Sequence, residues 1–261
     1  MKNKALKLII MKKPILFFAL LLLLGSWGCK KETDTPLVPP VTENPVYKVK
    51  TIVHDLGALG YIDTFRYDAN GRRISNTTSD GYTHSIRYTT TLAIDSYYSS
   101  SGFVLGTETY FLNADQRADS LTKVYLGATT YTKYYYDADG HMTVQKNFDN
   151  THALISIDNF IWENDNKTEA YRTSSTSQFV SHTVNYYDAS HKNTTGSQNT
   201  GWNILGLDSK NTMVSQYYTN TSSTLTIYNY VNTYDVQERV AQYSIYNNGG
   251  SLNSSHVYTY Y

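Results

Sequence analysis

A short recurring pattern limits the fold of this chain more than any other feature. An aromatic or apolar run ends in Asp or Asn, a turn follows, and a basic or polar residue begins the next run. The clearest copies are residues 65–72 (FRYDANGR) and residues 134–141 (YYYDADGH). Asn-Gly and Asp-Gly between strand-forming runs are strong β-hairpin signals, because Gly accepts the positive φ that such turns need. We predict structural turns at Asp68, Asn70, Gly71, Asp137, Asp139 and Gly140.

Weaker copies of the pattern follow at fairly even intervals. The anchor residues of all copies stand at positions 67, 112, 136, 162, 187, 207 and 234. Successive intervals are 45, 24, 26, 25, 20 and 27 residues, and we interpret the first as two periods with an eroded copy near Tyr88. A period in the twenties indicates an array of one supersecondary unit. We therefore predict seven to eight hairpin repeats.

The runs between these turns have the composition of β-strands. Residues 130–136 (TYTKYYY) and 224–231 (TLTIYNYV) are rich in residues that favour a pleated, half-buried surface. Residues 46–261 contain no proline and no sustained 3.6-residue apolar stripe. Two strands per repeat give about 14–16 strands, whereas open twisted sheets rarely exceed ~10 without curling. The predicted fold is all-β, an antiparallel meander forming a curled single sheet or an open barrel-like shell.

The YDANGR and YDADGH motifs resemble the YD repeats of RHS-type proteins. The chain as a whole resembles repeat-bearing bacterial lipoproteins of unknown function in Gram-negative envelopes, and the resemblance covers nearly all of residues 46–261. The resemblance implies a β-repeat fold and specifies no activity.

Residues 1–28 are organised as a secretory signal peptide. A positive flank at 12–13 precedes the apolar segment 15–24. That segment is about half as long as the ~20 residues that a membrane-spanning helix needs, so it suits a cleaved signal better than an anchor. Because Met11 already opens a complete positive flank, Met1 and Met11 are both candidate starts.

Cys29 resembles the acylated cysteine of a bacterial lipobox. It follows the stretch 25–28 (GSWG), although Ser26 stands where Leu is usual. As the single cysteine of the chain it has no internal disulfide partner. We expect it to carry acyl chains such as palmitate, and we predict no other cofactor. By analogy with known lipoproteins, Lys30 after the cysteine favours release to the outer membrane, on its periplasmic or cell-surface side.

Residues 29–45 form a polar, proline-rich tether that would hold the body, residues 46–261, away from the bilayer. The sequence has 22 basic and 22 acidic side chains, but five lysines lie in the signal peptide. Their removal leaves 17 basic against 22 acidic side chains, a net charge of −5. An acidic body without a basic cluster argues against a nucleic-acid partner, because phosphate contacts need many cations.

No catalytic or metal-binding residue is assigned from the sequence. The seven histidines are scattered, and there is no second cysteine to complete a sulfur site. Turn acids such as Asp137 and Asp139 could supply oxygen ligands to calcium, but a calcium loop needs six or more oxygens. An Asp that caps its own turn explains the presence of the same residues without a metal. Common hydrolase motifs such as Gly-x-Ser-x-Gly and His-Glu-x-x-His are absent from the sequence.

Tyrosine, with 26 copies, is the most distinctive component. Such rings serve either cross-strand packing or an exposed surface that stacks on sugars or docks a protein. The candidate stacking residues are Trp162, Trp202, Tyr135 and Tyr187. We expect a non-enzymatic binding or scaffolding module of the cell envelope, with a glycan or envelope protein as ligand and the membrane as a lipid-mediated partner. The alternatives are a secreted glycan-active hydrolase and an accessory subunit of an outer-membrane assembly.

Overall fold

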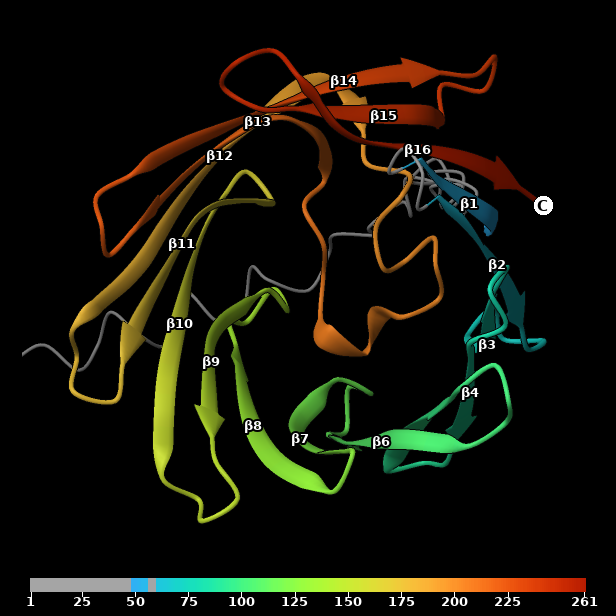
Figure 1. The fold of residues 1–261 in the computed structure, drawn as a ribbon, viewed down its shortest axis with the longest axis vertical. Coiled ribbons are helices and arrows are strands. Elements are labelled where there is room, and N and C mark those ends of the chain that lie inside the picture. The colour runs from blue at the N-terminus through green and yellow to red at the C-terminus, as the bar shows by residue number, and fades with distance from the viewer. Residues whose placement is uncertain (1–47, 56–59) are drawn as a thin grey trace, which may run out of the picture. The chain divides into compact units, whose positions relative to one another are not determined.

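The computed structural model describes residues 48–55 and 60–261, which form a β-barrel (Figure 1). The predicted signal peptide, Cys29 and the tether lie outside the described residues. Within them are sixteen strands and one 3-10 turn, η2 (Asn203–Leu205), and no helix is long and apolar enough to cross a membrane. The strands are β1 (Val49–Asp55), β2 (Tyr61–Tyr67), β3 (Arg73–Thr78), β4 (Thr83–Tyr88), β5 (Leu92–Tyr98), β6 (Val104–Leu112), β7 (Ala118–Tyr125), β8 (Ala128–Tyr136), β9 (Met142–Phe148), β10 (Leu154–Glu163), β11 (Asn166–Ser174), β12 (Phe179–Lys192), β13 (Asn211–Asn220), β14 (Leu225–Tyr234), β15 (Val240–Tyr246) and β16 (Leu252–Tyr260).

Each strand pairs antiparallel with its neighbours in sequence, and β16 closes the sheet by pairing with β1. In this closing pair Val53 lies opposite Val257, and His54 opposite His256. The prediction of an all-β antiparallel meander is confirmed, whereas that of an open or curled sheet is wrong. Closure satisfies the backbone N–H and C=O groups of two strands that would otherwise be free edges. Local hairpin signals carry no information about this pairing between the first and last strands.

A capped turn of one geometry joins many of the strands. In the β2–β3 turn, Asp68 Oδ1 accepts a hydrogen bond from the Asn70 N–H over 2.9 Å, and Gly71 has φ +72°. In the β8–β9 turn, Asp137 Oδ1 accepts a hydrogen bond from the Gly140 N–H over 2.8 Å, and Gly140 has φ +95°. The acid at the strand end therefore satisfies turn amides, and the left-handed residue three positions later directs the chain into the next strand.

Aromatic side chains at the ends of even-numbered strands brace one rim of the barrel. Each donates a hydrogen bond to a backbone carbonyl at or beside the start of the preceding odd-numbered strand. The donor–acceptor pairs are Tyr67–Val49, Tyr88–Arg73, Tyr136–Ala118, Trp162–Met142, Tyr187–Lys167 and Tyr260–Val240. The regular spacing of the anchor residues along the sequence therefore arises in part from these hydrogen bonds at the rim. The copy predicted at Leu207 is wrong, and with it the repeat count, because Leu207 lies between β12 and β13 and ends no hairpin.

Residues 193–210, which we call the plug, connect β12 to β13 and fold into the barrel (Figure 1). Backbone hydrogen bonds fasten the plug to well-separated parts of the rim. The Val49 N–H of β1 donates to the Asn199 carbonyl over 3.0 Å, and the Leu207 N–H donates to the Gly140 carbonyl of the β8–β9 turn over 3.2 Å. The plug is therefore an integral part of this end of the barrel.

The main apolar core lies where the plug packs against β5–β8. Ile204, in η2, is 5% exposed and belongs to one buried cluster with residues of these strands. The strand members of the cluster are Ala93, Tyr110, Ala118, Leu121 and Tyr134. The plug therefore supplies the apolar partner that these inward-facing side chains need, since burial of apolar surface is the main stabilising contribution.

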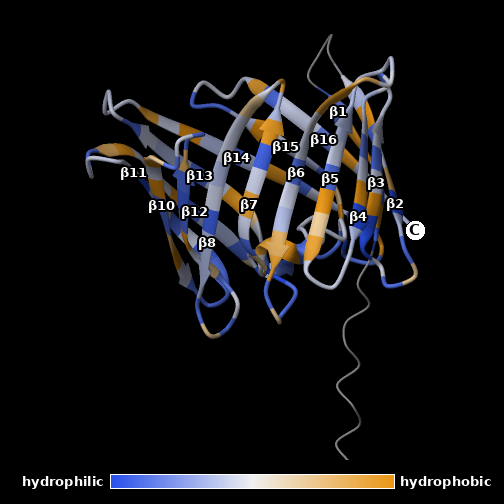
Figure 2. Cartoon of the chain, turned by 90° about the horizontal axis from the view of Figure 1, so that it is seen from below, coloured by the Kyte–Doolittle hydropathy of each residue, from blue (hydrophilic) through white to orange (hydrophobic). Residues whose placement is uncertain are grey.

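Elsewhere the inward face of the barrel is polar. Four acids on it are less than 10% exposed, and each lies within 3.1 Å of a basic partner. The pairs are His54–Asp63, His84–Asp95, Lys123–Glu108 and Arg172–Asp158. These acids could not be recognised from the sequence. They alternate along the strands with apolar side chains such as Ile62, and it is the apolar side chain that faces outward, 41% exposed. Figure 2 shows the resulting mixture of hydrophilic and hydrophobic positions along the strands.

Candidate ligand cavity inside the barrel

A cavity of about 570 Å³ lies between the plug and the inward faces of β9–β15. Its volume is within the roughly 300–1,000 Å³ typical of small-molecule sites. Aromatic rings, side-chain amides and a pair of opposite charges line it. The lining residues that matter most for its chemistry are Trp162, Lys167, Asn185, Tyr187, Asp208 and Gln216.

Two aromatic side chains on the cavity wall are held in place by polar contacts. The Trp162 Nε1–H donates to a backbone carbonyl of β9 over 2.8 Å, and its ring stacks on His141 with 4.4 Å between centroids. The Tyr187 hydroxyl donates to the Lys167 carbonyl over 2.7 Å and lies 2.8 Å from the Ser209 hydroxyl of the plug. Burial raises the pKa of the Tyr187 phenol, which therefore stays neutral at physiological pH.

Side-chain amides form another part of the wall. Asn185 Nδ2 donates to the Lys167 carbonyl over 2.8 Å, and Asn185 Oδ1 accepts from Gln216 Nε2 over 3.0 Å. On β14, Asn232 Nδ2 donates to the Met213 carbonyl over 3.0 Å. An amide has two donor hydrogens and an acceptor oxygen with two lone pairs. These bonds therefore orient the amides and leave further donors and acceptors for a ligand.

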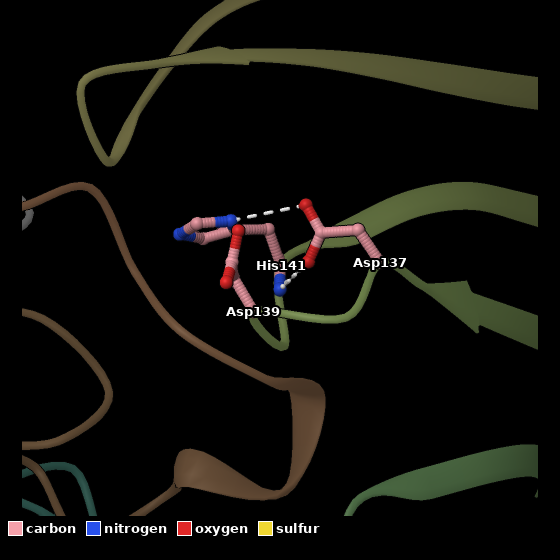
Figure 3. Close-up of side chains that lie close together, drawn as sticks. All are labelled: Asp137, Asp139 and His141. Carbon is pink, nitrogen blue, oxygen red and sulfur yellow. Dashed lines mark hydrogen bonds and ion pairs between the residues drawn. The ribbon is translucent and has the colours of Figure 1, made fainter. Parts of the chain in front are cut away.

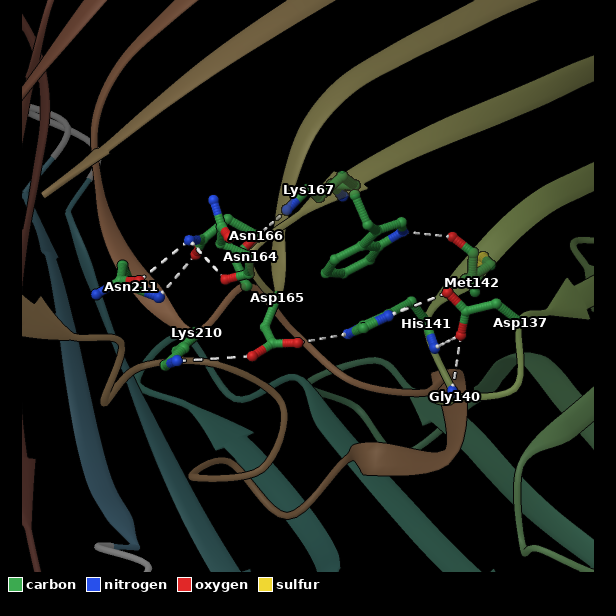
Figure 4. Close-up of polar contacts among 12 residues, drawn as sticks. Asp137, Gly140, His141, Met142, Asn164, Asp165, Asn166, Lys167, Lys210 and Asn211 are labelled. Atoms are coloured by element: carbon green, nitrogen blue, oxygen red, sulfur yellow. Dashed lines mark hydrogen bonds and ion pairs between the residues drawn. The ribbon is translucent and has the colours of Figure 1, made fainter. Parts of the chain in front are cut away.

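A chain of polar contacts supports this end of the cavity (Figure 4). His141 Nε2 lies 3.8 Å from Asp165 Oδ1, and Asp165 Oδ2 lies 3.6 Å from Lys210 Nζ in the plug. Beside them, Asn166 Nδ2 donates to Asn211 Oδ1 over 3.0 Å. The Lys210 N–H also donates to the Asp165 carbonyl over 2.9 Å, so the plug is bonded to the β10–β11 turn, and the β8–β9 turn lies beside both behind the aromatic wall.

One lysine and one carboxylate line the cavity among the residues that the structure describes. Lys167 Nζ lies 5.2 Å from the centroid of the Phe160 ring. Burial lowers the pKa of Lys167, and the negative charge of Asp208 acts in the opposite direction. Asp208 Oδ2 accepts a hydrogen bond from the Ser197 N–H, so this carboxylate is bonded within the plug.

The four predicted stacking residues lie in different environments. Trp162 and Tyr187 line the cavity. Trp202 packs edge-on against Tyr110, with 5.3 Å between ring centroids, at the border of the apolar core. Tyr135 is 43% exposed and points outward, because its neighbours along β8 face inward. The structure therefore brings two of the four to one site.

Sequence reasoning missed the polar part of the cavity. The missed residues are Lys167, Asn185, Asp208 and Gln216. They come from three strands and the plug, and the inward fold of the plug has no sequence motif. The available signal was the spacing, because Leu207 follows Tyr187 after 20 residues and breaks the period of 24–27 residues seen elsewhere. That irregularity marks residues 193–210 as an insertion.

Asp137, Asp139 and His141 bring three groups able to bind a metal within 4.8 Å of one another in the β8–β9 turn (Figure 3). His141 Nδ1 lies 3.1 Å from Asp137 Oδ2. The β2–β3 turn has the same design with arginine in place of histidine, since Arg72 Nε donates to Asp68 Oδ2 over 2.8 Å. A basic side chain against the capping acid is therefore a property of the turn, and we assign no metal to this cluster.

Comparisons with known proteins identify the fold and no family. No protein-family model matches the chain, and no curated protein matches it. The chain is similar to the crystal structure of a porin-like protein from Bacteroides uniformis, with 15% identity, a TM-score of 0.62 and coverage of 82% of this chain and 98% of that one. It is also similar to a porin-like protein from Bacteroides vulgatus, with 12% identity, a TM-score of 0.61 and coverage of 82% and 99%.

The predicted resemblance to YD-repeat, RHS-like proteins is wrong. The solved neighbours are porin-like, and the sheet of this chain closes on itself. The motif misled because it describes one capped turn, and other sequences in this barrel form the same turn. After β6, Asn113 Oδ1 accepts a hydrogen bond from the Asp115 N–H, and Gln116 takes the left-handed φ of +61°. A turn motif specifies a hairpin, and it does not specify the family of the sheet that contains the hairpin.

Proposed function

We propose that this chain is a lipid-anchored cell-envelope protein whose barrel binds a short glycan in the cavity beside the plug. The observation that carries the proposal is the placement of Trp162 and Tyr187 with the amides of Asn185 and Gln216 around one cavity. Aromatic rings offer flat faces to the C–H groups of a sugar, and amides offer both donors and acceptors to its hydroxyls.

The lining favours binding over hydrolysis. Most glycosidases use two carboxyl groups on either side of the scissile bond, roughly 5–9.5 Å apart. Asp208 is the single acid among the described lining residues, and its Oδ2 is bonded to the Ser197 N–H. A second carboxyl group to act as acid or base would have to come from elsewhere.

The plug favours a binding site over an open channel. It is bonded to β1 through Asn199 and to the β8–β9 turn through Leu207. Ser209 adds contacts to the Lys167 N–H at 3.0 Å and to the Tyr187 hydroxyl. A solute passing along the barrel would have to break several of these bonds, whereas a ligand in the cavity uses the plug as one wall.

Two lysines on the outer face favour a barrel that stands in water on a lipid anchor at Cys29. Lys133 and Lys146 lie opposite each other in β8 and β9, on the face away from the buried Tyr134. A lysine at the bilayer midplane costs about 2–4 kcal/mol, and membrane barrels carry an apolar outer band. Labelling cells with an alkyne fatty acid tests the anchor: we expect label on the wild type and none on Cys29→Ser. An unlabelled wild type would contradict the proposed lipid anchor.

A glycan array probed with the full chain carrying Cys29→Ser tests the binding site. We expect binding to a defined set of oligosaccharides, and its loss in Trp162→Ala and in Gln216→Leu. Tyr135→Ala is the matched control, because it removes an exposed ring outside the cavity. Thermal unfolding of each variant separates loss of binding from loss of fold. An array without any bound glycan would contradict the proposal, as would equal binding by all variants.

A further inference from the structure

Among the described residues, no carboxylate pairs with the ammonium of Lys167, which lines the cavity. Its Nζ lies over the Phe160 ring. Two other lysines of the barrel have acidic partners, Lys123 with Glu108 at 2.8 Å and Lys210 with Asp165 at 3.6 Å. In residues 48–55 and 60–261, by contrast, no carboxylate oxygen lies within 4.0 Å of Lys167 Nζ.

A partly buried cation without a counter-ion is unfavourable, because only a partner can offset the hydration that the ammonium loses. Burial accordingly lowers the pKa of Lys167, although the charge of Asp208 opposes that effect. Asp208 makes no ion pair with Lys167 in the described part of the chain, and its Oδ2 accepts a hydrogen bond from the Ser197 N–H. The cavity thus holds a positive charge whose closest available partner would be a negatively charged ligand.

The position of this charge relative to the rings indicates the kind of ligand. Lys167 lies opposite Trp162 in the β10–β11 register, and its carbonyl accepts the Tyr187 hydroxyl hydrogen bond. The cation, the stacking faces and the amides therefore belong to one wall. An acidic sugar combines the same three properties, with an anionic group, a flat C–H face and hydroxyls on one small ring.

We propose that the glycan bound in the cavity is acidic and that its anionic group, a carboxylate or a sulfate ester, pairs with Lys167. This inference rests on the proposed glycan-binding function and names the class of sugar. An ammonium–carboxylate bond is a charge-assisted hydrogen bond and is about twice as strong as a neutral one. Lys167 acts as a specificity-determining residue, while Trp162 and the amides bind the sugar body.

The experiment uses the full chain with Cys29→Ser on an array that holds uronic-acid, sulfated and neutral oligosaccharides. The strongest acidic ligand is then titrated by calorimetry beside its carboxyl-reduced or desulfated form. We expect wild-type protein to prefer the acidic form by about tenfold or more, and Lys167→Met to lose that preference while binding the neutral form unchanged. Comparison of the uronic-acid and the sulfated oligosaccharides shows which of the two anions is recognised.

Lys146→Met is the matched control. Lys146 Nζ also lies 5.2 Å from an aromatic centroid, that of Tyr135, but on the outer face of the barrel. This variant should bind the acidic form as the wild type does. Binding of neutral glycans alone would overturn the acidic assignment and leave the proposed function standing. An unchanged acidic preference in Lys167→Met would overturn the pairing of the anionic group with Lys167, whereas an array without bound glycans would overturn both this inference and the proposed function.

Discussion

The Tyr187 hydroxyl donates a hydrogen bond to the Lys167 carbonyl oxygen over 2.7 Å. The same hydroxyl lies 2.8 Å from the Ser209 hydroxyl, so a single phenol joins β12 to β11 and to the plug. It is also one of the aromatic donors that brace this rim. The side chain that supports the barrel end is therefore the one that positions the cavity wall, so the stability of the rim and the shape of the cavity are coupled at this point.

Tyr187→Phe should lower the free energy of unfolding by about 1 kcal/mol, the usual net value of one hydrogen bond. A larger loss is not expected, because Asn185 Nδ2 also donates to the Lys167 carbonyl and keeps it satisfied. Urea unfolding of the full chain measures the change. Tyr186→Phe is the control, since Tyr186 is 47% exposed on the outer face. Equal stability of the two variants would show that the rim bond contributes nothing.

Glu108→Gln should destabilise the barrel at neutral pH and lose that effect in acid. Burial raises the pKa of Glu108, but hydrogen bonds from Lys123, Tyr110 and Tyr97 outweigh it, so the pKa is lowered from its ordinary 4.5. A lowered carboxyl pKa stabilises the folded state above pH 4.5, and the contribution disappears as the pH falls through the folded-state pKa. Hydrogen bonds to charged groups contribute about 1.5–3 kcal/mol.

Urea unfolding of Glu108→Gln and the wild type between pH 7 and pH 3 measures this dependence. The difference between them should be largest at pH 7 and should narrow steadily below pH 4.5. Asp119→Asn is the control, because Asp119 is an exposed acid on β7, away from this network. A pH-independent difference for Glu108→Gln would mean that packing, and not ionisation, accounts for its role.

Local features of this fold could be predicted from the sequence, and long-range features could not. The capped turn at Asp68 is set by bonds between residues two to four positions apart. Barrel closure depends on pairs such as Val53 with Val257, which no local pattern encodes. Inward-facing acids such as Asp95 also resisted prediction, because strand alternation does not say which face is inside. Away from the apolar core under the plug, the barrel reverses the usual expectation that the inner face is apolar.

The residues of the candidate site also fall into those that could be predicted from the sequence and those that could not. Trp162 and Tyr187 could be picked out because they are aromatic residues at the regular anchor positions. Lys167 and Asp208 could not, since a lone lysine or aspartate in a polar stretch looks like a solvated surface residue. Their significance arises only when the plug folds inward and encloses them.

Lys167→Met should raise the stability of the ligand-free protein at neutral pH by roughly 1 kcal/mol, because it removes a half-buried charge that has no ion-pair partner among the described residues. The lysine pKa is lowered in the folded state, so the folded protein holds this proton less firmly than the unfolded chain. The penalty is therefore present below the folded-state pKa and is relieved as the pH rises from that value towards 10.5. The advantage of the variant should shrink over the same interval.

Chemical unfolding between pH 7 and pH 10.5 tests this prediction, with Lys146→Met as the outer-face control. The acidic ligand provides a second readout on the wild type, because its affinity should fall as Lys167 loses its proton. A Lys167→Met variant that is less stable than the wild type at pH 7 would indicate that the ammonium has a stabilising partner after all.

Gly206→Ala should loosen the plug, whereas the alanine variant of a glycine with positive φ in an open turn should not. Gly206 has φ +91°, and a Cβ there would lie 2.7 Å from the Gly140 carbonyl oxygen. Gly102 has φ +83° with no atom within 4 Å of such a Cβ. Gly206 also has ψ −162°, a backbone conformation that essentially only glycine adopts, so its alanine variant combines this strain with the close approach of plug and rim.

Amide hydrogen exchange reads out that difference at the right place, since the Leu207 N–H donates to the Gly140 carbonyl. Leu207 should exchange faster in Gly206→Ala than in Gly102→Ala, and glycan affinity should fall with it because the plug is one wall of the cavity. Faster exchange with unchanged affinity would mean that the ligand does not touch the plug. Unchanged exchange would mean that the plug tolerates a methyl group at its contact with the rim, and that other contacts hold it in the barrel.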